Sequence, residues 1–157
     1  MKILLAASEV APYAKTGGLA DVAGSLPTPL KTLGHDVRIV LPCYRSVKEN
    51  FDLTDEGVAA KIPFDGGLCT ARLLTASLDG IPVYFVDAPT YFDRDGLYGY
   101  ADGDYPDNAL RFGFFSRALL ELMKPLGWAP DILFINDWQT GLVPVSLKTL
   151  YTEHPFY

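Results

Sequence analysis

The sequence predicts one α/β domain of three layers, in which helices cover both faces of a mainly parallel sheet with an antiparallel hairpin at its edge. Residues 2–7, 36–41 and 131–136 are apolar runs with the length of buried strands. Helical patterns at 19–33 and 108–123 precede the second and third runs, and strands joined through helices indicate parallel crossovers. The length of 157 residues matches a single domain.

The composition limits the partners of the chain. A net charge of −6 and a pI near 4.7 argue against a nucleic acid or an anionic membrane, because both favour dense Lys and Arg patches. No apolar run reaches the roughly 18 residues of a spanning helix, and the first run is shorter than a signal-peptide core of roughly 7 to 15. Cys43 and Cys69 lie far apart, without metal-ligand spacing. We expect a cytoplasmic protein with no metal site.

The first strand leads into a long loop. Lys2–Ala7 is apolar on both faces, which favours a central strand covered by helices on both sides. Ser8–Ala14 then forms a loop longer than a minimal strand-to-helix turn, and ordered loops of that kind are often functional. Glu9 therefore stands at the carboxyl end of the first strand.

A lysine and two glycines precede the first helical pattern. Gly17 and Gly18 allow the backbone to approach a ligand, the first amides of a helix lack intrahelical partners, and Lys15 adds a positive charge. The lysine precedes the glycines, so this is not a Walker loop, and the G-x-G-x-x-G dinucleotide pattern is absent. We expect the loop to receive the phosphates of a nucleotide-linked substrate. The alternative is that the glycine pair only satisfies turn geometry.

The helix that follows is expected to break and restart near Ser25, because Pro27 and Pro29 interrupt it, and to stop at Gly34. Asp21 lies in its first turn, where a carboxylate stabilises the positive end of a helix. The apolar stripe expected to be buried consists of Leu19, Val22, Ala23, Leu26, Leu30 and Leu33.

The middle of the chain is rich in β-forming residues. Asp36–Leu41 is expected as the second strand, closed by Pro42, whereas 44–55 is polar and has no period. Asp79-Gly80 is a strong hairpin signal between two later runs, so we expect an antiparallel extension of the sheet. The runs that form this extension are 61–64, 69–78 and 82–87.

Residues 88–106 combine aromatic rings and carboxylates without a regular period. Such a stretch fits sugar binding, in which rings cover the apolar faces of a sugar and carboxylates accept bonds from its hydroxyls. It fits equally a loop that is packed by its own rings. The aromatic residues are Tyr91, Phe92, Tyr98, Tyr100 and Tyr105.

The next pattern predicts a helix capped by Asp107 or Asn108 and ended by Pro125. Its expected buried face consists of Leu110, Phe114, Phe115, Ala118, Leu119, Leu122 and Met123.

The chain finishes with a strand and a helix. Asp131–Asn136 is expected to be a buried strand, and Asp137 at its carboxyl end should lie on the same side of the sheet as Lys15. Gln139–Leu150 is expected to be a helix. Because no strand pattern follows it, we expect the chain to be a truncated part of a longer protein.

Five separated blocks together resemble the bacterial glycogen synthases and plant starch synthases, the glucosyltransferases that extend α-1,4-glucans with ADP-glucose. They run in order across nearly the whole chain. The blocks are Ser8-Glu9-Val10-Ala11-Pro12 with Lys15 to Val22, Gly34-His35-Asp36-Val37, Tyr105-Pro106-Asp107-Asn108, Arg111-Phe112, and Asn136-Asp137-Trp138.

The resemblance implies a GT-B enzyme, which has two Rossmann-like domains with the active site between them. Residues 1–157 would be a truncated N-terminal, acceptor-side Rossmann-like domain, without the C-terminal nucleotide-binding domain. The implied reaction transfers glucose from ADP-glucose to the non-reducing end of glycogen or starch with retention, and it uses no cofactor and no metal. We expect the isolated chain to be inactive, because further site residues would lie outside it.

The resemblance also implies roles for seven residues. Lys15 would contact the donor phosphates, with Gly17 and Gly18 letting the backbone approach. Asp21 and Asp137 are the catalytic candidates, and Asp21 would lie near the sugar site. Glu9, Tyr98 and Asp137 match positions associated with the acceptor glucan or the active-site cleft. Gln139 departs from the histidine that often follows the Asp-Trp pair.

Two other readings stay open from the sequence. One is a glycosyltransferase of the same architecture that uses another sugar nucleotide or acceptor, since base recognition would lie in the other domain. The second is a non-catalytic α/β binding domain, in which the glycine turn is only structural.

Overall fold

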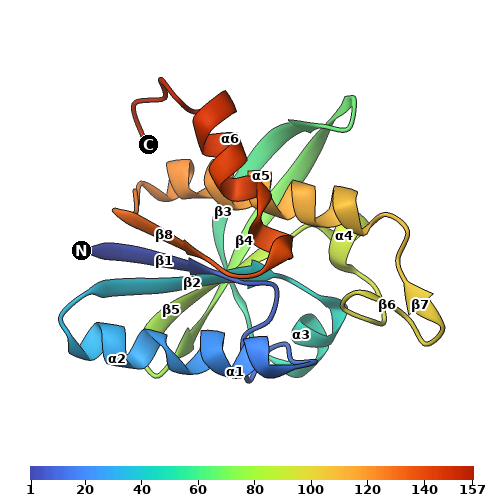
Figure 1. The fold of residues 1–157 in the computed structure, drawn as a ribbon, viewed down its shortest axis with the longest axis horizontal. Helices are drawn as coiled ribbons and strands as arrows, with labels where there is room; N and C mark the ends of the chain where they lie inside the picture. Colours follow the sequence, from blue (N-terminus) through green and yellow to red (C-terminus); the bar gives the residue numbers. More distant parts are fainter.

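The computed structural model describes residues 1–157 and has a six-stranded sheet between two layers of helices (Figure 1). The strands lie in the order β3-β4-β5-β2-β1-β8, and a separate two-stranded hairpin is formed by β6 and β7. The strands are β1 Lys2–Ala6, β2 Asp36–Pro42, β3 Thr54–Phe64, β4 Gly67–Leu78, β5 Ile81–Asp87, β6 Gly99–Tyr100, β7 Gly103–Asp104 and β8 Ile132–Ile135. The helices are α1 Gly18–Ser25, α2 Pro27–Thr32, α3 Arg45–Asn50, α4 Pro89–Phe92, α5 Asn108–Leu126 and α6 Leu142–Leu150, with a 3-10 turn, η1, at Trp138–Thr140.

The parallel half of the sheet confirms the predicted crossovers. β1 pairs in parallel with β2 on one side and with β8 on the other, so that Leu5 lies opposite Ile39 and Phe134. Leu5 and Ile39 are fully buried, because helices cover both faces here: α1 and α2 on one, α5 and α6 on the other (Figure 1). β1 is therefore a central strand whose carboxyl end opens onto the long loop.

The prediction that 131–136 is a buried strand is wrong in one respect. β8 is the edge of the sheet and pairs only with β1. Ile132 and Phe134 point to the same face of the strand and remain 39% and 40% exposed. An apolar run identifies the strand, but it does not reveal how many neighbours the strand has.

The antiparallel half is the predicted edge extension. β5 pairs in parallel with β2 and antiparallel with β4, and β3 completes a hairpin with β4. Asp79 and Gly80 have φ of 51° and 73°, so the hairpin signal was correct. Asp65 and Gly66 turn β3 into β4 with the same left-handed backbone, at φ of 51° and 71°.

The first helical segment breaks where the prolines predicted, since α1 ends at Ser25 and α2 begins at Pro27. The predicted stripe is only partly buried, because Val22 and Leu33 are exposed. α1 packs through small residues instead. A Cβ on Gly24 would lie 2.6 Å from the carbonyl oxygen of Ala11, so the helix approaches the loop after β1 too closely for a larger side chain.

The long helix α5 buries most of its predicted face, but Leu110 is exposed. Arg111 and Phe112 are buried in its place. Pro125 lies inside the last turn rather than ending the helix, and Gly127, with φ of 67°, is the residue that terminates it.

Two unperiodic segments have more structure than the sequence indicated. Within 44–55 the short helix α3 forms, and 88–106 contains α4 and the β6–β7 hairpin. The rings of 88–106 are mostly packed inward: Phe92 and Tyr105 are buried, and Tyr91 stacks on Phe114. None of the helices combines the length and apolar character that a membrane span requires.

Candidate substrate site

The predicted site residues come from loops at the carboxyl ends of neighbouring strands. β1 leads into Glu9 and Lys15, and β8 leads into Asp137. The two strands are parallel neighbours, so their carboxyl ends meet at one edge of the sheet. Tyr98 reaches this edge from the aromatic segment, because its hydroxyl contacts the residues that follow β1.

Glu9 is the centre of a buried network at this edge. Its Oε1 accepts hydrogen bonds from the Tyr98 hydroxyl at 2.7 Å and the Thr16 hydroxyl at 2.8 Å. Its Oε2 accepts from the backbone amides of Thr16 and Gly17, the latter at 3.2 Å. Burial opposes ionisation, but the four donated bonds outweigh it and hold the pKa of Glu9 below its usual value. The charged carboxylate of Glu9 is therefore bound by donors of the protein itself.

This network corrects one expectation about the glycine loop. The Gly17 amide already donates to Glu9, so it is not free for a phosphate. Gly18 begins α1, where a backbone amide has no acceptor within the helix. The anion-binding capacity of the loop therefore resides in Gly18 and the next amides of α1, together with Lys15.

The geometry of the two glycines bears on the alternative of a purely structural turn. Gly17 is extended, with φ of −151°, and Gly18 is helical; neither has the positive φ that requires glycine. A Cβ built on either residue meets no atom within 4 Å. The chain itself would accept alanine at both positions, so its own packing gives no reason for the glycines.

Lys15 forms an exposed ion pair with Asp21. Lys15 Nζ lies 2.6 Å from Asp21 Oδ1, and both side chains are more than half exposed. An exposed pair of this kind contributes only about 0 to 1 kcal/mol, because water screens it. A phosphate can therefore replace Asp21 as the partner of Lys15 at little cost.

Asp137 has a constrained backbone and a half-used carboxylate. Its φ is 64°, a left-handed value that is uncommon for a residue with a side chain, and its Oδ1 accepts from the Trp138 amide at 2.7 Å. Trp138 is 55% exposed, and its ring lies 5.1 Å from that of Phe112 and 6.5 Å from that of Tyr98. Asp137 thus stands beside an aromatic cluster with one carboxylate oxygen uncommitted.

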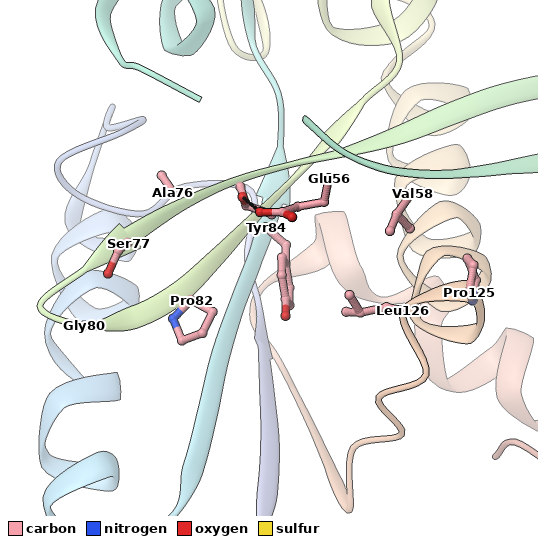
Figure 2. Close-up of a pocket in the computed structure, with 10 residues that line it drawn as sticks. Glu56, Val58, Ala76, Ser77, Gly80, Pro82, Tyr84, Pro125 and Leu126 are labelled. Carbon is pink, nitrogen blue, oxygen red and sulfur yellow. Dashed lines mark hydrogen bonds between the residues drawn. The ribbon is translucent and has the colours of Figure 1, made fainter. Parts of the chain in front are cut away.

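A pocket of about 260 Å³ borders this aromatic cluster, lined in part by Phe112, Trp138 and Gln139. The largest pocket, of about 480 Å³, lies elsewhere: it is formed by β3, β4, the amino end of β5 and the end of α5 (Figure 2). Three of its polar side chains have protein partners, since Tyr84 accepts from Arg38 and Glu56 from Thr75. Size alone therefore does not locate the substrate site.

Comparisons with known proteins place the chain in a family. A model of the family described as the starch synthase catalytic domain matches residues 2–157. The chain belongs to this family.

Relatives of this starch synthase family chain include the glycogen synthases of Syntrophotalea carbinolica, 58% identical over 158 residues, and of Moorella thermoacetica, 49% identical over 160 residues. Each alignment covers 100% of the chain but only 33% and 31% of those proteins, so the chain spans about a third of the curated relatives it matches. Among solved structures, the catalytic domain of starch synthase IV from Arabidopsis thaliana, bound to ADP and acarbose, is 36% identical with a TM-score of 0.83. That match covers 96% of the chain and 30% of the plant protein, and it supports the Rossmann-like half of a GT-B fold.

Sequence reasoning missed several residues that organise the site of this starch synthase family chain. Thr16 contributes both its hydroxyl and its amide to Glu9, and the Ser8 hydroxyl lies 2.8 Å from that of Tyr98. The position of Thr16 between the lysine and the glycines is a signal that could have been used. Arg111 was expected only as part of a family block, although it is fully buried behind Tyr98.

A second buried carboxylate at the same edge has a structural role. Asp87 ends β5 and is buried between Lys48 of α3, at 2.5 Å, and Arg72 of β4, at 3.1 Å. It ties these elements to the sheet. Within residues 1–157 no group of three or more His, Cys, Asp or Glu side chains lies together as a metal site would require.

Proposed function

We propose that the chain is the N-terminal, acceptor-side domain of a retaining glucosyltransferase that moves glucose from ADP-glucose to the non-reducing end of an α-1,4-glucan. Its curated relatives are named glycogen synthases, and its structural neighbour is a starch synthase bound to ADP and acarbose. A second domain, beyond residues 1–157, would bind the nucleotide and close the active site.

The observation that carries this proposal is the glycine pair beside Lys15. The backbone of Gly17 and Gly18 does not need glycine, and the space in which their side chains would stand is empty of protein atoms. Missing side chains therefore leave room for a molecule to approach the main chain. A lysine beside that space, at the amino end of a helix, favours an anion.

The donor phosphates would bind to Lys15 and the free amides of α1. As the bond between glucose and phosphate breaks, negative charge accumulates on the leaving phosphate. A fixed cation and oriented amides stabilise that charge more strongly than they stabilise the intact donor, which lowers the barrier. Asp21, released from Lys15 when the phosphate arrives, would then face the sugar of the donor.

The acceptor would lie against the aromatic cluster of Tyr98, Phe112 and Trp138. Aromatic rings cover the apolar faces of glucose units, and the uncommitted oxygen of Asp137 can accept a bond from a sugar hydroxyl. Glu9 has four protein donors, so its contribution is to hold the loop and the Tyr98 ring in place.

The test is to replace Gly18 with alanine in the full-length enzyme. At a helical position the change should leave the melting temperature unchanged or raise it, because alanine restricts the unfolded chain more than glycine does. Affinity for ADP-glucose should fall at least tenfold, because the new methyl group occupies the approach to the amides. Normal affinity in a correctly folded Gly18→Ala enzyme would contradict the proposal.

A panel of sugar nucleotides tests which donor the enzyme uses. The full-length enzyme should transfer glucose from ADP-glucose to maltooligosaccharides, with other sugar nucleotides as controls. Faster transfer from another sugar nucleotide would support a glycosyltransferase but contradict ADP-glucose as its donor.

A further inference from the structure

Arg111 is a charged side chain that the proposed chemistry does not use. It lies in the first turns of α5 and is fully buried, and it forms no ion pair. The nearby Asp107 carboxylate is bound instead by Arg94, whose Nη1 donates to it at 2.8 Å. Burying an unpaired guanidinium is costly unless other interactions compensate for the lost hydration.

Backbone carbonyls, the Asn108 side chain and aromatic rings provide part of that compensation, while Nη2 is buried without a hydrogen-bond partner. Arg111 Nε donates to the Tyr91 carbonyl at 2.7 Å, and Nη1 donates to the Leu97 carbonyl at 3.0 Å and to Asn108 Oδ1 at 2.7 Å. The guanidinium also lies 4.8 Å from the centre of the Tyr105 ring. Burial lowers the pKa of Arg111, but an arginine remains protonated in proteins.

These bonds converge on the residue that holds Glu9. The Leu97 carbonyl belongs to the peptide group directly before Tyr98, and the Tyr98 carbonyl accepts from Asn108 Nδ2 at 2.8 Å. Both peptide groups that flank the Tyr98 Cα are thereby fixed to the first turns of α5. From there the Tyr98 ring extends to Glu9, which in turn binds the amides of Thr16 and Gly17.

We propose that Arg111 is a positioning residue for the substrate site: with Asn108, it fixes the backbone of Tyr98 so that the tyrosine hydroxyl holds Glu9, and Glu9 holds the glycine loop. Helix α5 is thus connected to an exposed loop in three steps: from α5 to the Tyr98 backbone, from the Tyr98 hydroxyl to Glu9, and from Glu9 to the loop. The inference rests on the proposed function only for its effect on catalysis. The physical link itself can be tested without substrate.

The test measures the pKa of Glu9 by NMR titration of its side-chain carboxyl carbon in the 157-residue protein. Arg111→Lys keeps the positive charge, but a single ammonium cannot reach both the Tyr91 and Leu97 carbonyls as the guanidinium fork does. Tyr98 should then lose its fixed position, and the pKa of Glu9 should rise, because the charged form loses one hydrogen-bond donor. Tyr98→Phe, which removes that donor directly, should produce the same rise.

Arg94→Lys is the matched control. It makes the same chemical change at the same junction of loop and helix, but Arg94 binds Asp107 and touches neither peptide group beside Tyr98. The pKa of Glu9 should not change in this variant. If Arg111→Lys does not fold, Asn108→Ala replaces it, because Asn108 is only half-buried and supplies the one side-chain bond to the Tyr98 carbonyl, which also accepts from the Tyr105 amide at 2.9 Å.

An unchanged pKa of Glu9 in a folded Arg111→Lys or Asn108→Ala protein would overturn the inference. An equal rise in Arg94→Lys would also overturn it, because the effect would then be a general loosening of the segment. In the full-length enzyme, Arg111→Lys and Tyr98→Phe should lower kcat/KM by the same factor, and the double variant should lower it no further. A shifted pKa without any change in kcat/KM would uphold the positioning link and count against the proposed site.

Discussion

Two carboxylates of the candidate site differ in how the protein uses them. Glu9 is buried and receives four hydrogen bonds from the chain, whereas Asp21 is exposed and shares one ion pair with Lys15. The first interaction is strong and fixed by several donors; the second is weak and screened by water. The comparison indicates that the site has a rigid frame, built on Glu9, and an exchangeable ion pair that a ligand can replace.

The largest expected effect follows from removing the frame. Glu9→Ala leaves the Tyr98 hydroxyl and the amides of Thr16 and Gly17 without their acceptor, so the free energy of unfolding should fall by about 2 to 3 kcal/mol. Chemical denaturation of the variant and the unaltered protein measures this loss. A loss as small as that of Asp21→Asn would remove the distinction between the two carboxylates.

Lys15→Ala tests the exchangeable pair in the full-length enzyme. If Lys15 binds the donor phosphates as proposed, its loss should lower kcat/KM for ADP-glucose roughly ten- to hundredfold, equivalent to about 1.5 to 3 kcal/mol. The melting temperature should hardly change, because the exposed ion pair contributes little to stability. Steady-state kinetics and a thermal melt of the same preparation test this prediction. A large loss of stability would show that Lys15 belongs to the rigid frame built on Glu9.

The pH dependence of stability sharpens the comparison. The pKa of Glu9 is lowered in the folded protein, so its ionised form contributes stability that is fully present above its unfolded pKa of about 4.5. That contribution is lost as the pH falls through the lower folded pKa. Glu9→Gln should therefore be less stable than the unaltered protein at pH 7, and the difference should diminish below pH 4. A constant difference between pH 7 and pH 3 would contradict the assignment.

The smallest effect is expected for Asp21→Asn. Removing one exposed partner should change the free energy of unfolding by no more than about 0.5 kcal/mol. In the full-length enzyme the variant separates two roles for Asp21: a partner of Lys15 alone leaves kcat nearly intact, whereas a carboxylate that faces the donor sugar makes kcat fall. Binding and turnover measured with ADP-glucose distinguish these outcomes.

Much of the fold could be predicted, because strands and turns have local signals. The apolar runs located β1, β2 and β8, and Asp79-Gly80 located the hairpin between β4 and β5. Burial was harder to predict because it depends on neighbours that are distant in sequence. Val22 is exposed because α1 packs through small residues, and Phe134 is exposed because β8 has one neighbour.

The site was predicted less completely than the fold. The sequence placed Lys15, Glu9 and Asp137 after strands, and the structure brings those strand ends to one edge of the sheet. It did not reveal that Glu9 turns back to accept the Gly17 amide, since a bond between a side chain and a backbone eight residues away leaves no periodic pattern. Nor did it reveal that Arg111 is buried, because a charged residue on a helix is usually exposed.

The close approach of α1 to the loop after β1 has a consequence for mutational scanning. Gly24 tolerates only a hydrogen atom opposite the Ala11 carbonyl, so a library selected for folding should lose nearly every substitution there. The same library should retain alanine at Gly17 and Gly18, where an added methyl group would meet no protein atom within 4 Å. If the proposed function is right, selecting the library for glucan synthesis in the full-length enzyme would deplete alanine at that pair. Subtracting one profile from the other would then separate the glycines that the fold requires from those that the proposed ligand requires.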